Sequence, residues 1–96
     1  MNKIALITGA TAGIGEACAT EFARNGYNLI INGRREDRLK KLSTSLQKQF
    51  DIDVLPMVFD VRDRKSVEDI FTDLPPEWMK INVLVNNAGL ASGLDP

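Results

Sequence analysis

The sequence predicts an α/β fold, the N-terminal part of a doubly wound parallel sheet with strand order 3-2-1-4 and flanking helices. Short apolar runs at residues 4–7, 29–31, 54–59 and 81–85 alternate with segments whose apolar residues recur at helical spacing. This alternation is typical of parallel strands joined by helical crossovers. Pro56, in the third run, has no backbone N–H to donate, so that strand is expected at a sheet edge, which fits the order 3-2-1-4.

Length and composition exclude several function classes. The 96 residues make one small domain at most, and 12 basic residues nearly balance 13 acidic ones, with no basic stripe for nucleic acid. No apolar stretch is long enough to span a membrane, and the N-terminus lacks the pattern of a signal peptide. The chain has no histidine and a single cysteine, Cys18, which excludes a histidine-based triad and an internal disulfide within it. A cytoplasmic location is therefore expected.

The first strand leads through a glycine-rich turn directly into a helix. Gly9 can adopt the tight turn, Gly13 lets the backbone approach a pyrophosphate, and Gly15 lets the helix pack close to the strand. Backbone N–H groups and the positive end of the helix dipole meet at this turn, and together they form a phosphate site. Three glycines alone are also compatible with an ordinary turn between a strand and a helix.

The first helix is expected from about Gly13 to Asn25, with Gly26 as its C-terminal stop. Apolar residues at helical spacing predict which face is buried. On this basis Cys18 is a small buried hydrophobe rather than a reactive thiol. The residues assigned to this face are Ile14, Ala17, Cys18 and Phe22.

Two adjacent arginines follow the second strand. In a dinucleotide-binding fold this position, about 20 residues beyond the glycines, reads the adenosine ribose, and an acidic residue there favours NAD. Here Arg34 and Arg35 stand in its place, and guanidinium groups suit a phosphate dianion. Cations at a helix N-terminus oppose the helix dipole unless an anion binds there. We therefore predict that both arginines bind the 2′-phosphate of NADP, the alternative being a solvated charge pair.

The next helix should carry its apolar residues on one face, with Arg38 either assisting at the phosphate or lying on the surface. The residues of this face are Leu39, Leu42, Leu46 and Phe50. The third strand ends at Asp60, which by itself could be a turn or cap residue.

Beyond Asp60, Asp63 is predicted to cap a third helix that ends before Pro75. Trp78 is interpreted as a packing anchor of the following loop. The fourth strand then runs into Asn86-Asn87-Ala88-Gly89, which could be a plain polar turn.

Four marks in this order resemble the short-chain dehydrogenase/reductase family: the Thr-Gly-x3-Gly-Ile-Gly turn, the arginine pair, Asp60-Val61 and Asn-Asn-Ala-Gly. The resemblance covers essentially all of residues 1–96 and implies a Rossmann fold. It also implies that Asp60 and Val61 contact adenine, that Asn87 to Gly89 line the nicotinamide-side ribose, and that Asn86 is structural. The expected cofactor-binding residues are Gly9, Ala10, Thr11, Ala12, Gly13, Ile14, Gly15, Arg34, Arg35, Asp60, Val61, Asn87, Ala88 and Gly89.

The sequence around the arginine pair, Leu74 to Trp78 and Asn86 to Gly93 looks like the NADP-dependent 3-hydroxy acid dehydrogenases, also described as serine 3-dehydrogenases. That resemblance implies hydride transfer between NADP(H) and a small 3-hydroxy acid or serine-like substrate, in a homotetramer. The alternatives are a 3-oxoacyl-carrier-protein reductase of the same family and a non-catalytic NADPH-binding protein.

The family's Tyr-x-x-x-Lys pair, which carries the proton transfer, is not matched: Tyr27 is the single tyrosine, and Ile31 stands four residues later. No catalytic residue is assigned to residues 1–96. The chain is therefore expected to be the NADP-binding part of a longer enzyme, an incomplete domain. With one edge of its fourth strand unpaired, this part alone is expected to be marginally stable or self-associating.

Overall fold

A computed structural model describes residues 2–60 and 62–87, and it contains every predicted strand and helix. The predicted bounds differ from the observed ones by one or two residues at most ends, the usual uncertainty where helices and strands fray. In chain order the elements are β1 (Ile4–Thr8), α1 (Gly13–Arg24), β2 (Asn28–Gly33), α2 (Glu36–Gln49), β3 (Val54–Val58), α3 (Arg64–Thr72), the short 3-10 helix η1 (Pro76–Trp78) and β4 (Val83–Asn86).

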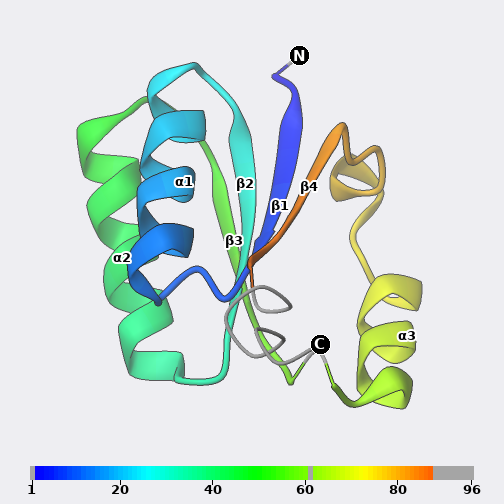
Figure 1. The fold of residues 1–96 in the computed structure, drawn as a ribbon. Coiled ribbons are helices and arrows are strands. Elements are labelled where there is room, and N and C mark those ends of the chain that lie inside the picture. Colours follow the sequence, from blue (N-terminus) through cyan, green and yellow to red (C-terminus); the bar gives the residue numbers. More distant parts are fainter. Residues whose placement is uncertain (1, 61, 88–96) are drawn as a thin grey trace.

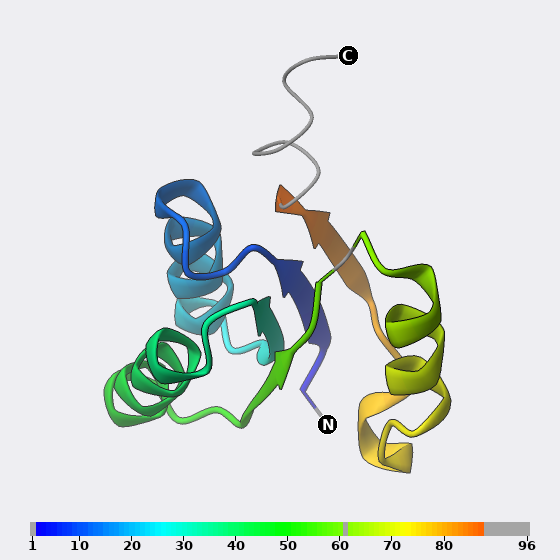
Figure 2. The same cartoon turned by 90° about the horizontal axis from the view of Figure 1, so that it is seen from below.

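The four strands form one parallel sheet in the order β3-β2-β1-β4, which confirms the predicted topology. Helices α1 and α2 cover one face and α3 covers the other, so the sheet lies between two helical layers (Figure 1, Figure 2). The edge position expected from Pro56 is confirmed, because β3 pairs with β2 alone among the described strands. Since all strands run in one direction, their carboxyl ends meet at one edge of the sheet.

The core has two parts, one on each face of the sheet. Strand β1 is buried along its whole length, and β2 from Leu29 onward, which explains why both read as continuous apolar runs. On the α1/α2 face, Ile7 and Ile31 pack with Leu39 and Leu46 of α2. On the α3 face, the cluster of buried residues comprises Ile4, Leu6, Ile30 and Leu74, with Trp78 packed against it as predicted.

The buried face of α1 differs from the prediction. Gly15, Ala19 and Ala23 are buried, whereas Ile14 is 70% exposed and Ala17 is also exposed. Of the predicted residues, Phe22 does pack against the core, but Cys18 is half-buried rather than buried. The predicted face followed the larger apolar residues, but a helix that packs closely on a sheet places its smallest side chains at the contact. A stripe of small residues at i, i+4 and i+8 was therefore the correct signal.

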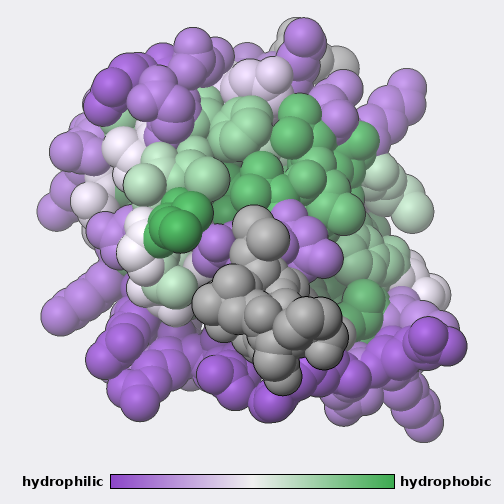
Figure 3. Space-filling model, in the orientation of Figure 1, coloured by the Kyte–Doolittle hydropathy of each residue, from purple (hydrophilic) through white to green (hydrophobic). Residues whose placement is uncertain are grey.

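Strand β4 has an open side. Among the described residues it pairs with β1 alone, and Leu84 is 62% exposed. Val83 and Val85 point to the other face and pack against the α1/α2 cluster. Figure 3 shows apolar side chains gathered over this side of the molecule. None of the helices in the described residues has both the length and the apolar character needed to cross a bilayer.

Candidate functional site

The segments predicted to bind the cofactor meet at the carboxyl edge of the sheet. The glycine-rich turn follows β1, the arginine pair follows β2, and Asn87 follows β4. Residues from the first two segments line a hollow of about 470 Å³. The residues that line it are Thr11, Ala12, Arg34, Arg35 and Arg38. The presence of Arg38 favours the assisting position that the sequence left open.

The glycine-rich turn leaves backbone donors available at the start of α1. Gly9 adopts φ 61°, a left-handed conformation that glycine adopts without strain, and its carbonyl accepts from Ala12 N–H at 3.1 Å. The N-cap residue Ala12 makes no side-chain cap bond, and the first helical bond is from Glu16 N–H to its carbonyl, 2.8 Å. The three N–H groups between them thus have no partner inside the helix, which suits an anion.

Two glycines of the turn have different surroundings. A Cβ at Gly15 would overlap the Gly9 carbonyl oxygen and come within 2.7 Å of the Asn87 Nδ2 atom. The predicted close packing at Gly15 is therefore confirmed. A Cβ at Gly13 would meet no atom within 4 Å, so this backbone faces open space, and the approach of a pyrophosphate there stays a prediction.

The arginine pair stands at the N-terminus of α2. Arg35 is the N-cap residue, and both side chains are exposed. Within residues 2–60 and 62–87, neither guanidinium has an ion-pair partner among the carboxylates. Two unpaired cations at the positive end of a helix dipole are unfavourable by themselves, and a bound dianion would relieve both effects.

Asp60 follows β3 at the same edge, and its carboxylate is bonded to Arg62, a contact that the sequence did not predict. Arg62 donates from Nη2 to Oδ2 at 2.8 Å and from Nε to Oδ1 at 3.1 Å, and its backbone N–H reaches Oδ1 at 2.9 Å. These bonds lower the pKa of Asp60 from 3.8 to about 2, with a small further contribution from the charge of Arg34. Asp60 is thus an ionised acceptor that is affected by the charge of Arg34. Val61 lies outside the described residues.

Asn87 is 3% exposed and donates from Nδ2 to the Gly9 carbonyl oxygen at 3.0 Å. Its amide therefore holds the glycine-rich turn, in addition to any contact with a cofactor. Asn86 accepts from the Thr8 hydroxyl at 3.2 Å, which agrees with its predicted structural role. Ala88 and Gly89 lie outside the described residues.

Sequence reasoning missed Asn32 at the end of β2, which is buried and bonded to both neighbouring segments. The available signal was an asparagine that ends an apolar strand, where residues of this type are depleted. By contrast, the predicted cap at Asp63 is confirmed, since its carboxylate accepts from Ser66 N–H at 3.3 Å.

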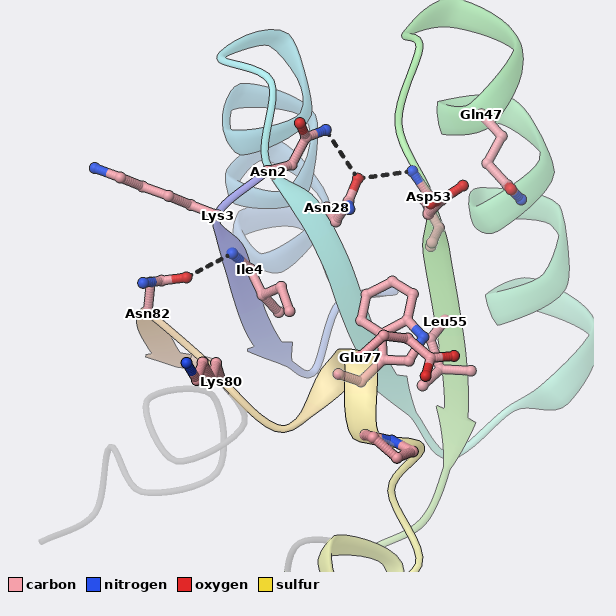
Figure 4. Close-up of a pocket in the computed structure, with 13 residues that line it drawn as sticks. Asn2, Lys3, Ile4, Asn28, Gln47, Asp53, Leu55, Glu77, Lys80 and Asn82 are labelled. Carbon is pink, nitrogen blue, oxygen red and sulfur yellow. Dashed lines mark hydrogen bonds between the residues drawn. The ribbon is translucent and has the colours of Figure 1, made fainter.

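A larger hollow, about 930 Å³, lies at the opposite, amino edge of the sheet (Figure 4). Its amides are bonded to the protein: Asn28 Oδ1 accepts from Asn2 Nδ2 and from Asp53 N–H, and Asn82 Oδ1 accepts from Ile4 N–H. The C-termini of α1 and α2, the negative ends of their dipoles, point towards this edge. It is therefore a poor phosphate site in spite of its size.

Comparison with known proteins identifies relatives of this chain. Residues 3–95 match the short-chain dehydrogenase family. An NADP-dependent 3-hydroxy acid dehydrogenase of Salmonella typhi is 48% identical over 97% of this chain and 36% of its own length. A sulfoacetaldehyde reductase of Chromohalobacter salexigens is 46% identical over 100% of this chain and 37% of its own.

Solved structures agree with the fold. Serine dehydrogenase from Escherichia coli superimposes with a TM-score of 0.79 and 40% identity, over 88% of this chain and 37% of that one. L-Sorbose reductase from Gluconobacter frateurii, solved with NADPH and L-sorbose, gives a TM-score of 0.84 and 35% identity, over 92% and 34%. The chain thus spans little more than a third of these relatives. The strand order and helical layers confirm the predicted Rossmann fold, and the family match over residues 3–95 identifies the chain as a member of the short-chain dehydrogenase family.

Proposed function

We propose that this chain is the NADP-binding N-terminal part of an oxidoreductase that transfers a hydride between NADP(H) and the carbon of a CH–OH group. The observation that carries the proposal is the hollow in which Arg34 and Arg35 adjoin Thr11 and Ala12 of the glycine-rich turn. It brings two unpaired guanidinium groups beside the uncapped start of α1. Related proteins are described as NADP-dependent or were solved with NADPH, which supports the same cofactor here.

Each part of the site has a proposed task. The backbone from Gly9 to Gly15 would hold the pyrophosphate, and Arg34 with Arg35 would hold the 2′-phosphate. Asp60 and Val61 would read the adenine edge, and Asn87 to Gly89 would line the ribose beside the nicotinamide. When bound there, the cofactor supplies the hydride chemistry. The residues of this chain bind and orient it, and no proton-transfer residue is proposed among them.

For the substrate, we propose a small 3-hydroxy acid or a serine-like compound, following the names of the Salmonella and Escherichia coli relatives. The whole protein is proposed to be a cytoplasmic homotetramer. The alternative function that the sequence left open is NADPH binding without catalysis. Oxidation of 3-hydroxy acids or serine by the complete gene product with NADP⁺, followed at 340 nm, separates the two.

The cofactor is tested by calorimetry with NADPH and NADH on the complete gene product and on an Arg34→Ala, Arg35→Ala double variant. We expect the double variant to lose on the order of 100-fold in NADPH affinity and to bind NADH as before, because two charge-assisted contacts disappear.

A matched control, Arg24→Ala with Lys48→Ala, removes two cations from the last turns of α1 and α2 at the opposite edge of the sheet. It should bind both cofactors as the wild type does. Equal affinity of the wild-type protein for NADPH and NADH would overturn the 2′-phosphate site. A folded wild-type protein that binds neither would overturn the proposed function.

A further inference from the structure

Asn32 is a polar residue at the buried end of an otherwise apolar strand. Its side chain is 2% exposed, and the three residues before it in β2, Leu29 to Ile31, are fully buried. An amide in such a place is costly unless all its hydrogen-bonding groups have partners. The structure provides partners on both sides.

The side chain of Asn32 bridges two segments that flank β2. On one side its Oδ1 accepts from Gly9 N–H at 3.4 Å, and its backbone carbonyl accepts from Ala10 N–H at 2.8 Å. On the other side its Nδ2 donates to the carbonyl oxygens of Phe59, at 2.9 Å, and Met57, at 3.3 Å. The amide thus acts as one more peptide group, which extends the sheet ladder beyond the last residues of β1 and β3.

Both partners of this bridge lie next to proposed cofactor contacts. Gly9 opens the turn that presents the free N–H groups of α1, and Phe59 directly precedes Asp60. The neighbouring Gly33 helps the turn to dock, because a Cβ there would come within 3.3 Å of the Thr11 side chain. The end of β2 therefore sets the position of the phosphate-binding turn relative to the adenine-reading loop.

We propose that Asn32 is a positioning residue that fixes the spacing between the phosphate-binding turn and the Asp60 loop, so that one dinucleotide reaches both. This inference rests on the proposed function. It predicts a specific pattern in the affinities for the two cofactors. Loss of the bridge weakens the binding of NADPH and of NADH by the same factor, because both contain the pyrophosphate and the adenine and because the arginine pair is intact. Loss of the arginines, in contrast, affects NADPH alone.

Two substitutions separate the two sides of the bridge. Asn32→Ala removes both sides, so that the Gly9 N–H and the carbonyl oxygen of Phe59 lose these bonds. Asn32→Asp has nearly the same shape and still accepts from Gly9 N–H, but it cannot donate, and its carboxylate faces two carbonyl oxygens. Both variants should bind NADPH and NADH about tenfold more weakly or worse.

Asn28 provides a matched control on the same strand. Its side chain also joins β2 to the β3 segment, by accepting from Asp53 N–H at 2.9 Å, but it does so at the amino edge, away from the proposed site. Asn28→Ala should lower the midpoint of urea unfolding without changing either dissociation constant by more than about twofold. This difference separates positioning of the site from general stability.

The experiment measures both dissociation constants by calorimetry on the complete gene product, after circular dichroism has shown each variant to be folded. If the Ala or Asp variant does not fold, Asn32→Ser retains a hydroxyl donor and acceptor, and its dissociation constants should exceed those of the wild type. Wild-type affinity in folded Asn32 variants, or an equal loss in Asn28→Ala, would overturn the inference alone. A folded wild-type protein that binds neither cofactor would instead reject the proposed function.

Discussion

At both the amino and the carboxyl edge of the sheet, asparagine side chains form hydrogen bonds to the backbone of neighbouring segments. The two edges differ in which segments these bonds hold. At the amino edge, Asn28 and Asn82 bond to the backbone at the beginning of neighbouring strands. At the carboxyl edge, Asn32 and Asn87 bond to the glycine-rich turn. The bonds at the amino edge hold strand ends alone, whereas those at the carboxyl edge also fix the position of the turn that is proposed to bind the cofactor.

The directions of the helices are the reason that we propose the site at the carboxyl edge. Both α1 and α2 run antiparallel to the strands, so their N-termini lie beside the ends of β1 and β2 (Figure 1). Uncapped N–H groups and the arginine pair add positive charge there. The hollow at the amino edge is about twice as large, yet it faces the negative helix ends. The proposed position of the site therefore follows the local electrostatic field rather than the size of the cavity.

The largest effect is expected from Gly15→Ala, which attacks the carboxyl edge where it is most tightly packed. Its Cβ would meet the backbone of Gly9, which cannot move without displacing β1 or the turn. We expect a loss of about 3 kcal/mol or more in the free energy of unfolding, measured in urea. A loss below about 1 kcal/mol would show that the turn is adaptable rather than rigid.

Gly13→Ala is the matched substitution two residues earlier. Because no atom lies within 4 Å of the added Cβ, stability should be unchanged or raised by up to about 1 kcal/mol. If the pyrophosphate approaches this backbone, NADPH binding should nevertheless weaken about tenfold, as an added methyl group keeps the phosphate at a distance. Unchanged affinity would remove Gly13 from the proposed contacts.

Asn87→Ala and Asn82→Ala compare the two edges at the two ends of β4. Asn82→Ala removes the hydrogen bond of 2.9 Å that Ile4 N–H donates at the amino edge. It should lower the free energy of unfolding by about 1 kcal/mol and leave the NADPH affinity unchanged. Asn87→Ala leaves the Gly9 carbonyl with one partner fewer. It should lower the free energy of unfolding by about 1–3 kcal/mol and should also weaken NADPH binding. Equal effects on binding in the two variants would contradict the difference between the edges.

The sequence predicted the strand order, the edge position of β3 and the close packing at Gly15, because each depends on a local rule for proline, glycine or apolar runs. It did not predict the buried face of α1, because small residues contribute little to an apolar pattern. The bridge at Asn32 and the pair of Asp60 with Arg62 also escaped prediction. The first joins residues more than 20 positions apart, and the second depends on how a loop folds back.

A moderate effect is expected from salt. Salt screens the attraction between exposed arginines and a phosphate. Raising the ionic strength from about 0.05 to about 0.5 M should therefore weaken NADPH binding several-fold and NADH binding less. In the Arg34→Ala, Arg35→Ala variant the two cofactors should share the smaller salt dependence, as followed by calorimetry. Identical salt dependence of both cofactors in the wild-type protein would indicate that the arginines do not contact the 2′-phosphate.

The smallest effect concerns the charge of Asp60. Its pKa of about 2 lies below the usual 3.8, chiefly because Arg62 donates to the ionised carboxylate. The associated stability is therefore present above pH 3.8 and is lost as the pH falls towards 2. Arg62→Ala should raise this pKa towards 3.8, and Arg34→Ala should raise it less, since Arg34 acts through its charge alone. Carboxyl ¹³C NMR titration measures both. A larger shift in Arg34→Ala would mean that the arginine pair, rather than Arg62, controls the acceptor proposed to read adenine, and that the carboxyl edge responds to charge as one unit.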